Sequence, residues 1–249
     1  MIRVIYILWL RQMKRFFRSR VRLISSLAMP LLFLFSLGFG FGPIFAKAGE
    51  GNYIQFVTPG IVAMSLVFTG IFSGIEIIWD KQFGFLKETL VAPVSRLDIM
   101  IGRTLGGATV SVLQGLLVLL VSTLVGFKIP GLGMVILTIF FMFMIAILFT
   151  ALGTAIASVL DDMHAFQLIM NFLVMPLFFL SGAIFPLDDV SVWMGRVASI
   201  DPLSYGVDSI RWALTGISYF GAVLDLILLF VITSILLIIG AKMFAKIEI

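Results

Sequence analysis

Of the 249 residues, 61% are hydrophobic and 12% are charged, against roughly 45–50% and about 25% in a typical soluble domain. The mean hydropathy of +1.19 excludes a water-soluble globular fold and predicts an all-α polytopic membrane protein. Cys is absent and His occurs once, which excludes disulfide frameworks, Cys-based metal sites and thiol catalysis. The formal net charge of +4 is explained by its position beside the membrane, and we expect no nucleic-acid partner.

The first 22 residues are predicted to form an amphipathic helix that lies on the inner membrane leaflet. Five cationic side chains fall within an arc of about 100° on a helical wheel, and apolar side chains fall opposite. Two interpretations stay open for this helix. It acts either as a lever that moves during function or as an anchor that fixes orientation.

Residues 23–249 are predicted to form one transmembrane domain of six spanning helices. A charge at the bilayer centre costs at least about 2.5 kcal/mol, so long gaps between charged residues indicate five of the spans. The sixth is an apolar run with Asp225 near its start and Lys242 near its end, where either charge can reach the interface. The predicted spans cover residues 23–43, 55–79, 104–126, 132–159, 165–183 and 219–244.

The distribution of Lys and Arg predicts the orientation of these spans. One side of the membrane receives 13 of these residues and the other side receives 4. Positive charge favours the cytoplasm. We therefore expect a multi-pass protein of the plasma membrane with both termini in the cytoplasm.

The loop between the second and third predicted spans, residues 79–103, is too polar to span a membrane and too apolar to be a free linker. Pro93 disfavours helix at Ala92, so two short helices are predicted to meet there. Ser95 is a predicted helix N-cap, with Asp98 three residues further on.

Two segments resemble the membrane subunits of type-2 ABC transporters, in particular the antibiotic and multidrug-resistance exporters. The first is DKQFGFLKETLVAPVSRLDIMIGR, starting at Asp80, and the second runs from Pro176 to Gly216. Ser191 stands where many members of the family have Pro, and Asp201 stands where many have Asn.

The resemblance implies a membrane subunit that pairs with a second one, here expected to be an identical copy, and with two separate ATP-binding cassette subunits. ATP and Mg would bind to those partners, and we expect this chain to hold no cofactor or metal and no catalytic residue. The 249 residues contain no P-loop motif, which agrees with ATP binding on the partner subunits.

The resemblance also implies a coupling helix that contacts the ATPase, and short helices after the fifth span that dip back from the outer surface. An outer gate and a plain capping layer are both compatible with these short helices. The predicted coupling residues are Asp80, Lys81, Phe85, Lys87, Glu88, Pro93, Arg96 and Asp98, and the predicted gate residues are Phe185, Pro186, Trp193, Pro202 and Tyr205.

Polar residues within the predicted spans indicate a substrate path or interhelical hydrogen bonding. These candidates are Gln114, Gln167 and Asn171. The cargo expected is a drug, lipid or lipid-linked molecule, hydrophobic or amphipathic, exported by alternating access. An ion-coupled transporter that uses Glu76 or Asp225 is the alternative, and a membrane-embedded hydrolase is disfavoured because no Gly-x-Ser-x-Gly motif occurs.

Overall fold

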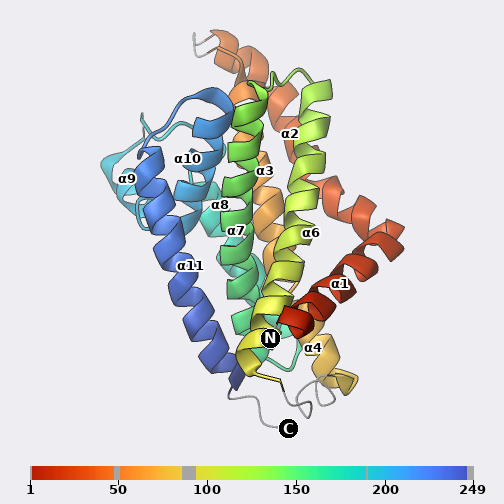
Figure 1. The fold of residues 1–249 in the computed structure, drawn as a ribbon. Coiled ribbons are helices and arrows are strands. Elements are labelled where there is room, and N and C mark those ends of the chain that lie inside the picture. Colours follow the sequence, from red (N-terminus) through yellow and green to blue (C-terminus); the bar gives the residue numbers. More distant parts are fainter. Residues whose placement is uncertain (1, 48–50, 86–93, 189, 246–249) are drawn as a thin grey trace.

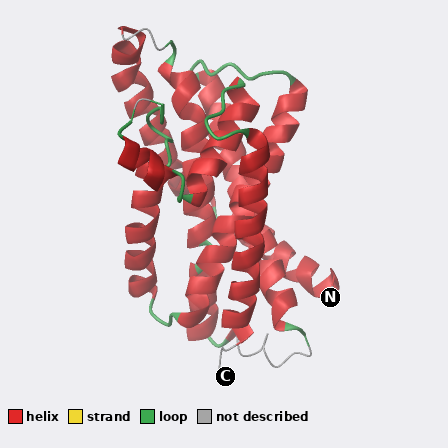
Figure 2. Cartoon of the chain, turned by 90° about the vertical axis from the view of Figure 1, so that its left-hand side faces the viewer, coloured by secondary structure: helices red, strands yellow, loops and turns green. Residues whose placement is uncertain are grey.

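The computed structural model describes residues 2–47, 51–85, 94–188 and 190–245, and these residues contain helices and no strand. Six helical segments are long and apolar enough to cross a membrane. They confirm the predicted all-α polytopic fold. The helices form one elongated bundle, with two short helices on one side (Figure 1, Figure 2).

The first two helices meet at a corner. α1 (Ile2–Arg18) ends at Arg18, and α2 (Arg20–Lys47) starts two residues later, so the amphipathic helix is shorter than the predicted 22 residues. α2 also continues beyond residue 43, because Pro43 lies inside the helix without ending it. Its spanning part is Leu23–Lys47.

The second span lies at the centre of the bundle. It consists of α3 (Tyr53–Phe72) and α4 (Ile75–Gln82), which are separated by a short break at Ser73 and Gly74. Of its most apolar window, 72% of residues are buried. Asn52 begins α3 as an N-cap, since its side chain accepts a hydrogen bond from the backbone N–H of Ile54.

The remaining helices surround this centre. They are α6 (Arg96–Leu124), α7 (Leu132–Val159), α8 (Met163–Leu180), α9 (Val192–Ala198), α10 (Pro202–Thr215) and α11 (Ala222–Ala245). Only 17–22% of the apolar windows of α2, α8 and α11 are buried. These three helices therefore expose apolar surface to lipid or to another protein chain.

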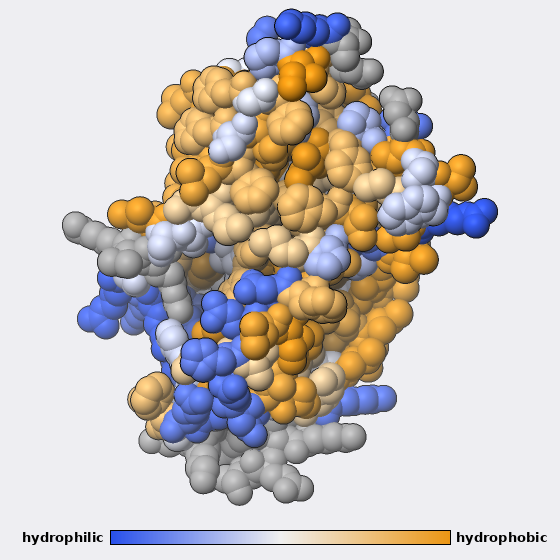
Figure 3. Space-filling model, turned by 180° about the vertical axis from the view of Figure 1, so that it is seen from behind, coloured by the Kyte–Doolittle hydropathy of each residue, from blue (hydrophilic) through white to orange (hydrophobic). Residues whose placement is uncertain are grey.

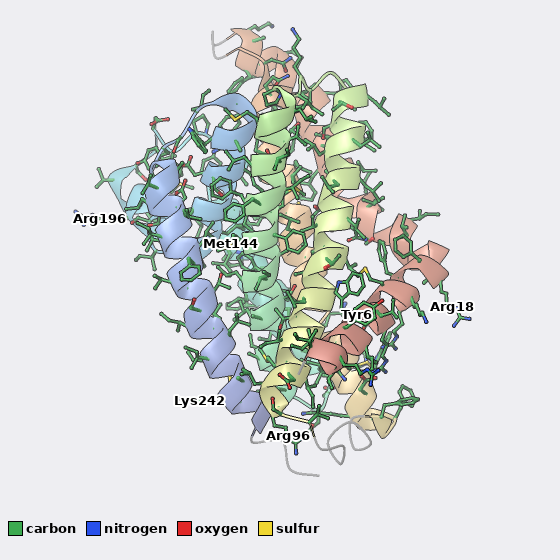
Figure 4. The ribbon with its side chains drawn as sticks, viewed as in Figure 1. Tyr6, Arg18, Arg96, Met144, Arg196 and Lys242 are labelled. Atoms are coloured by element: carbon green, nitrogen blue, oxygen red, sulfur yellow. The ribbon has the colours of Figure 1, made fainter. Side chains whose placement is uncertain are left out.

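The two ends of the bundle differ. The start of α1, the start of α6 and the end of α11 lie at one end, called the lower end from its place in Figure 1. Arg96 and Lys242 mark this end in Figure 4. The end of α2 and the start of α3 lie at the opposite, upper end, and α9 and α10 lie in the upper half. Figure 3 shows hydrophobic side chains over most of the middle of the rear face, with hydrophilic ones gathered below.

Candidate functional site

Asp80 on α4 is the centre of an ion-pair network at the lower end of the bundle. Its carboxylate accepts two hydrogen bonds from the guanidinium of Arg11 on α1, at 3.0 and 2.8 Å. It accepts a third from Arg103 on α6, at 2.6 Å. The side chains of Asp80 and Arg103 are only 3% and 5% exposed. One buried carboxylate thus ties α4 to both α1 and α6.

The close packing of α1 on α6 makes this network possible. Gly102 and Gly106 lie one turn apart on α6, on the face toward α1. A Cβ atom at Gly102 would lie 3.1 Å from the Cα of Ile5, and one at Gly106 would lie 2.6 Å from the Cγ of Gln12. Trp9 adds a hydrogen bond from its indole N–H to the hydroxyl of Thr109, at 3.0 Å. The predicted amphipathic helix is therefore docked along the third span.

Two further contacts hold α4. Glu76, one turn before Asp80, pairs with Arg15 of α1 at 3.2 Å. Lys81 donates to the backbone carbonyls of Ser158 and Leu160, at 2.7 and 3.1 Å, and so reaches the turn between α7 and α8. Residues of three separate elements thus converge on the eight residues of α4.

Several of the predicted coupling residues come just before or just after residues 86–93 in the sequence. Phe85 is 54% exposed, and the guanidinium of Arg11 lies 5.7 Å from the centre of its ring, within the range of a cation–π contact. Asp98 is buried in the first turn of α6, where its backbone N–H donates to Ser95, which confirms the predicted N-cap. Arg96, half-buried, begins this helix. Lys87, Glu88 and Pro93 lie outside the described residues.

A partly open cavity of about 420 Å³ is lined by residues of α1, α2, α3, α4 and α6. Gln114 lines it and is 1% exposed. The amide of Gln114 donates to the hydroxyl of Ser26 on α2 and accepts a hydrogen bond from Thr69 on α3. One predicted path residue therefore lines a cavity and also bonds three helices together.

The other two predicted path residues lie elsewhere. Gln167 and Asn171 are exposed on α8 and do not line this cavity. They are four residues apart, so they share one face of α8. The structure thus separates Gln114 from the α8 pair, which lies on a face that no described residue of this chain covers.

The segment after α8 packs tightly onto the upper part of α3. The hydroxyl of Tyr53 donates to the backbone carbonyl of Ile184 at 2.8 Å. A Cβ atom at Gly60 would lie 2.2 Å from the carbonyl oxygen of Ala183, so only glycine permits this approach. Of the predicted gate residues here, Phe185 and Pro186 are half-buried.

The two short helices differ in burial. On α9, Trp193 is 62% exposed. On α10, Pro202 is the first residue, which suits the fixed φ of proline, and Asp201 is the N-cap that accepts from the N–H of Leu203 at 2.8 Å. The hydroxyl of Tyr205 donates to the carbonyl of Ser199 at 2.5 Å and so fixes the α9–α10 corner.

Burial shifts the pKa of two groups, Asp201 at the N-cap of α10 and Arg211 within this helix. Burial raises the pKa of Asp201 to about 7, although the N–H of Leu203 opposes the shift. Burial also lowers the pKa of Arg211 to about 10, against the attraction of Asp208 and Asp188. Arg211 donates to the carbonyl of Gly182 at 2.8 Å and lies 4.3 Å above the ring of Phe56.

Sequence analysis named no partner for Asp80 and did not single out Arg15. In the structure Arg103 hydrogen-bonds Asp80 and also attracts Glu76, whereas Arg15 makes the ion pair with Glu76. The position of Arg15 on the cationic arc of α1 was the available signal. Among the described residues, no group of three or more His, Cys, Asp or Glu side chains is placed to hold a metal.

Comparison with known proteins places this architecture in a family. The family model described as ABC-2 type transporter matches residues 3–215. The chain is 31% identical over 202 residues to a protein of Cyanophora paradoxa named as a transport permease, ycf38, a match that covers 78% of this chain and 68% of the relative.

Two further relatives cover similar shares. Nodulation protein J of Rhizobium leguminosarum bv. trifolii is 28% identical over 78% of this chain and 74% of its own length. The daunorubicin resistance ABC transporter permease protein DrrB1 of Streptomyces coeruleorubidus is 27% identical over 86% of this chain and 75% of its own length. Because the family model covers most of its length, the chain belongs to the ABC-2 type transporter family.

Proposed function

We propose that this chain is the membrane-spanning subunit of an ATP-driven exporter in the plasma membrane. Two separate ATP-binding cassette subunits would bind ATP and Mg and hydrolyse ATP. The cargo would be a hydrophobic or amphipathic molecule, such as a drug, a lipid or a lipid-linked molecule. Membership of the family and the name of the daunorubicin resistance relative support this proposal.

The observation that carries the proposal furthest is the Asp80 network. The chain leaves α4 at Gln82 and enters α6 at Arg96, both at the lower end, and we propose that an ATPase seated there pushes on these two helix ends. A displacement of α4 would move α1 through Arg11 and α6 through Arg103, because Asp80 bonds both. It would also move the α7–α8 turn through Lys81. A local push would thereby tilt several spanning helices together.

The lower end would face the cytoplasm. Arg96 and Lys242 lie at this end (Figure 4), and α1, which carries cationic residues, starts there; the positive-inside rule supports this orientation. Both termini would then be cytoplasmic. The half-buried Phe185 and Pro186, together with α9 and α10, would form the outer gate.

A second copy of the chain would complete the transport path. α2, α8 and α11 leave large apolar faces uncovered. α8 also exposes Gln167 and Asn171 on a span where polar side chains facing lipid are costly. A second copy packed against α8 would shield this pair from lipid and place it along a path between the subunits.

Charge reversal at the coupling segment tests this function. The chain is reconstituted in liposomes with its ATPase partner, and ATP hydrolysis and ATP-dependent release of a fluorescent amphiphile are measured together. We expect Arg96→Glu to abolish transport while hydrolysis continues. Lys242→Glu, at the same end but on α11 (Figure 4), is the matched control and should transport normally. Normal transport by the Arg96 variant would remove the coupling assignment.

A further inference from the structure

Beside the face that docks on α6, α1 exposes a row of apolar side chains. Tyr6 and Phe17 are 55% and 65% exposed, and Ile2 is exposed as well. At about 100° per residue, these three side chains lie within an arc of about 60° on the helix. An exposed apolar row of this kind marks a contact surface for lipid or for another molecule.

An open groove on α1 includes the end of this row. The side chains that line it are Trp9, Leu10, Met13, Lys14, Phe17 and Arg18. Among these described residues, only Lys14 and Arg18 are charged, and both are exposed and lie one turn apart. Figure 4 shows Arg18 at the outer edge of α1, away from the rest of the bundle. The groove therefore joins an apolar floor to two neighbouring cations.

The cations of α1 fall into two pairs with different surroundings. Arg11 and Arg15 form ion pairs with the carboxylates of α4. Lys14 and Arg18 form no ion pair within the part of the chain that the structure describes. Like charges one turn apart on a helix repel each other. An anionic group that contacts both side chains would remove this repulsion, so the groove is complementary to negative charge.

The position of the groove favours a lipid over a protein. Leu23, the first residue of the spanning part of α2, follows shortly after Arg18 in the sequence. Cations just before a span lie at the level of lipid headgroups. Only 17% of the apolar window of α2 is buried, so the lipid that covers α2 lies next to the groove. A phospholipid matches both parts of the groove, since its phosphate suits the cations and its acyl chain suits the apolar floor.

We propose that Lys14 and Arg18 bind the phosphate of an anionic phospholipid, whose acyl chain covers Leu10, Met13 and Phe17. The guanidinium of Arg18 can donate two parallel hydrogen bonds to phosphate oxygens, and the ammonium of Lys14 adds a point charge. A zwitterionic lipid is less suitable, because its own ammonium group would lie close to the two cations. A lipid held in this way would fix the corner between α1 and α2 at the membrane surface.

The test compares two lipids with the same acyl chains and different headgroups, phosphatidylglycerol and phosphatidylcholine. Binding to the full chain is measured by native mass spectrometry in detergent micelles, without ATPase or ATP. We expect a saturable adduct with phosphatidylglycerol and an affinity for phosphatidylcholine about tenfold lower or less. Equal affinity for the two lipids would overturn the proposal.

Two double variants with the same change in net charge locate the site. Lys14→Gln/Arg18→Gln should weaken binding of phosphatidylglycerol about tenfold or more, since each cation near an anionic lipid contributes about fivefold in affinity. Arg3→Gln/Lys242→Gln is the control, because both of its positions are exposed and neither lines the groove. It should bind phosphatidylglycerol like the unmodified chain. Phe17→Ser, which removes part of the apolar floor, should also weaken binding.

All five substituted side chains are exposed, so the variants should fold, and gel filtration and thermal melting verify this. Equal losses in the two double variants would overturn the proposal, because the attraction would then be general. If Lys14→Gln/Arg18→Gln keeps the lipid and instead loses a co-purifying protein, this face of α1 binds a protein and the lipid site is refuted. Because no ATPase is present in the lipid assay, its failure leaves the coupling test at Arg96 standing, and a failure of coupling leaves lipid binding intact.

Discussion

Asp80→Asn is expected to destabilise the folded chain strongly. The substitution keeps the shape of the side chain and removes its charge. Arg103, whose side chain is 5% exposed, then loses the carboxylate that lies 2.6 Å from it. Removing one partner of a buried ion pair typically costs about 3–5 kcal/mol, because the other charge stays buried without compensation.

A matched pair of variants separates this effect from the loss of any surface charge. Asp161→Asn also breaks an ion pair, with Lys81 at 3.1 Å, but the Asp161 side chain is 90% exposed. Exposed pairs contribute about 0–1 kcal/mol. The double variant Asp80→Asn/Arg103→Gln should regain much of the loss, since neither buried charge of that pair remains.

The assay is reversible unfolding of the purified chain in mixed detergent micelles, followed by tryptophan fluorescence. We expect Asp80→Asn to lose several times more free energy of unfolding than Asp161→Asn. Equal losses for the two variants would refute the buried-pair reasoning. A double variant less stable than Asp80→Asn alone would show that Arg103 contributes through contacts other than Asp80.

Three further predictions concern the rest of the bundle. Gly60→Ala forces a Cβ atom against the Ala183 carbonyl and should lower the free energy of unfolding by about 1–3 kcal/mol in the same assay. Gly40→Ala is the control. No atom lies within 4 Å of its added Cβ, so it should be neutral or slightly stabilising. Burial raises the pKa of Asp201 to about 7. The stability due to its protonated form is therefore complete below about pH 4 and is lost as pH rises to about 7. Asp201→Asn should flatten that part of the curve of unfolding free energy against pH, and an unchanged slope would contradict this. Asp225 is fully buried close to a second carboxylate, that of Asp208. Asp225→Asn removes the repulsion between the two and should raise the melting temperature at pH 8; a lower melting temperature would contradict this argument.

The architecture could be predicted from the sequence because lipid imposes a simple rule. A spanning helix must avoid charge over about 20 residues, so gaps between charges located five spans. The sixth was located as an apolar run with Asp225 and Lys242 near its two ends. The helix ends were less predictable. Pro43 was expected to end the first span, yet α2 includes it, because helix packing within a membrane can tolerate an internal proline.

The candidate site was only partly predictable. Asp80 lies within the coupling motif, but its partner Arg11 lies 69 residues away, and only the docking of α1 on α6 brings the two together. The same holds for Gln114, which meets Ser26 across 88 residues. A local pattern indicates which face of a helix a residue occupies. It does not indicate which helix packs against that face.

The central claim is that a separate ATPase drives this chain through the connection between α4 and α6. The most direct measurement is purification of the tagged chain from its native membrane at physiological salt, with mass spectrometry of the proteins that accompany it. The account predicts that a P-loop ATPase accompanies the chain in stoichiometric amount. A chain that purifies alone and transports without ATP would contradict the account and would favour ion coupling at Glu76 or Asp225.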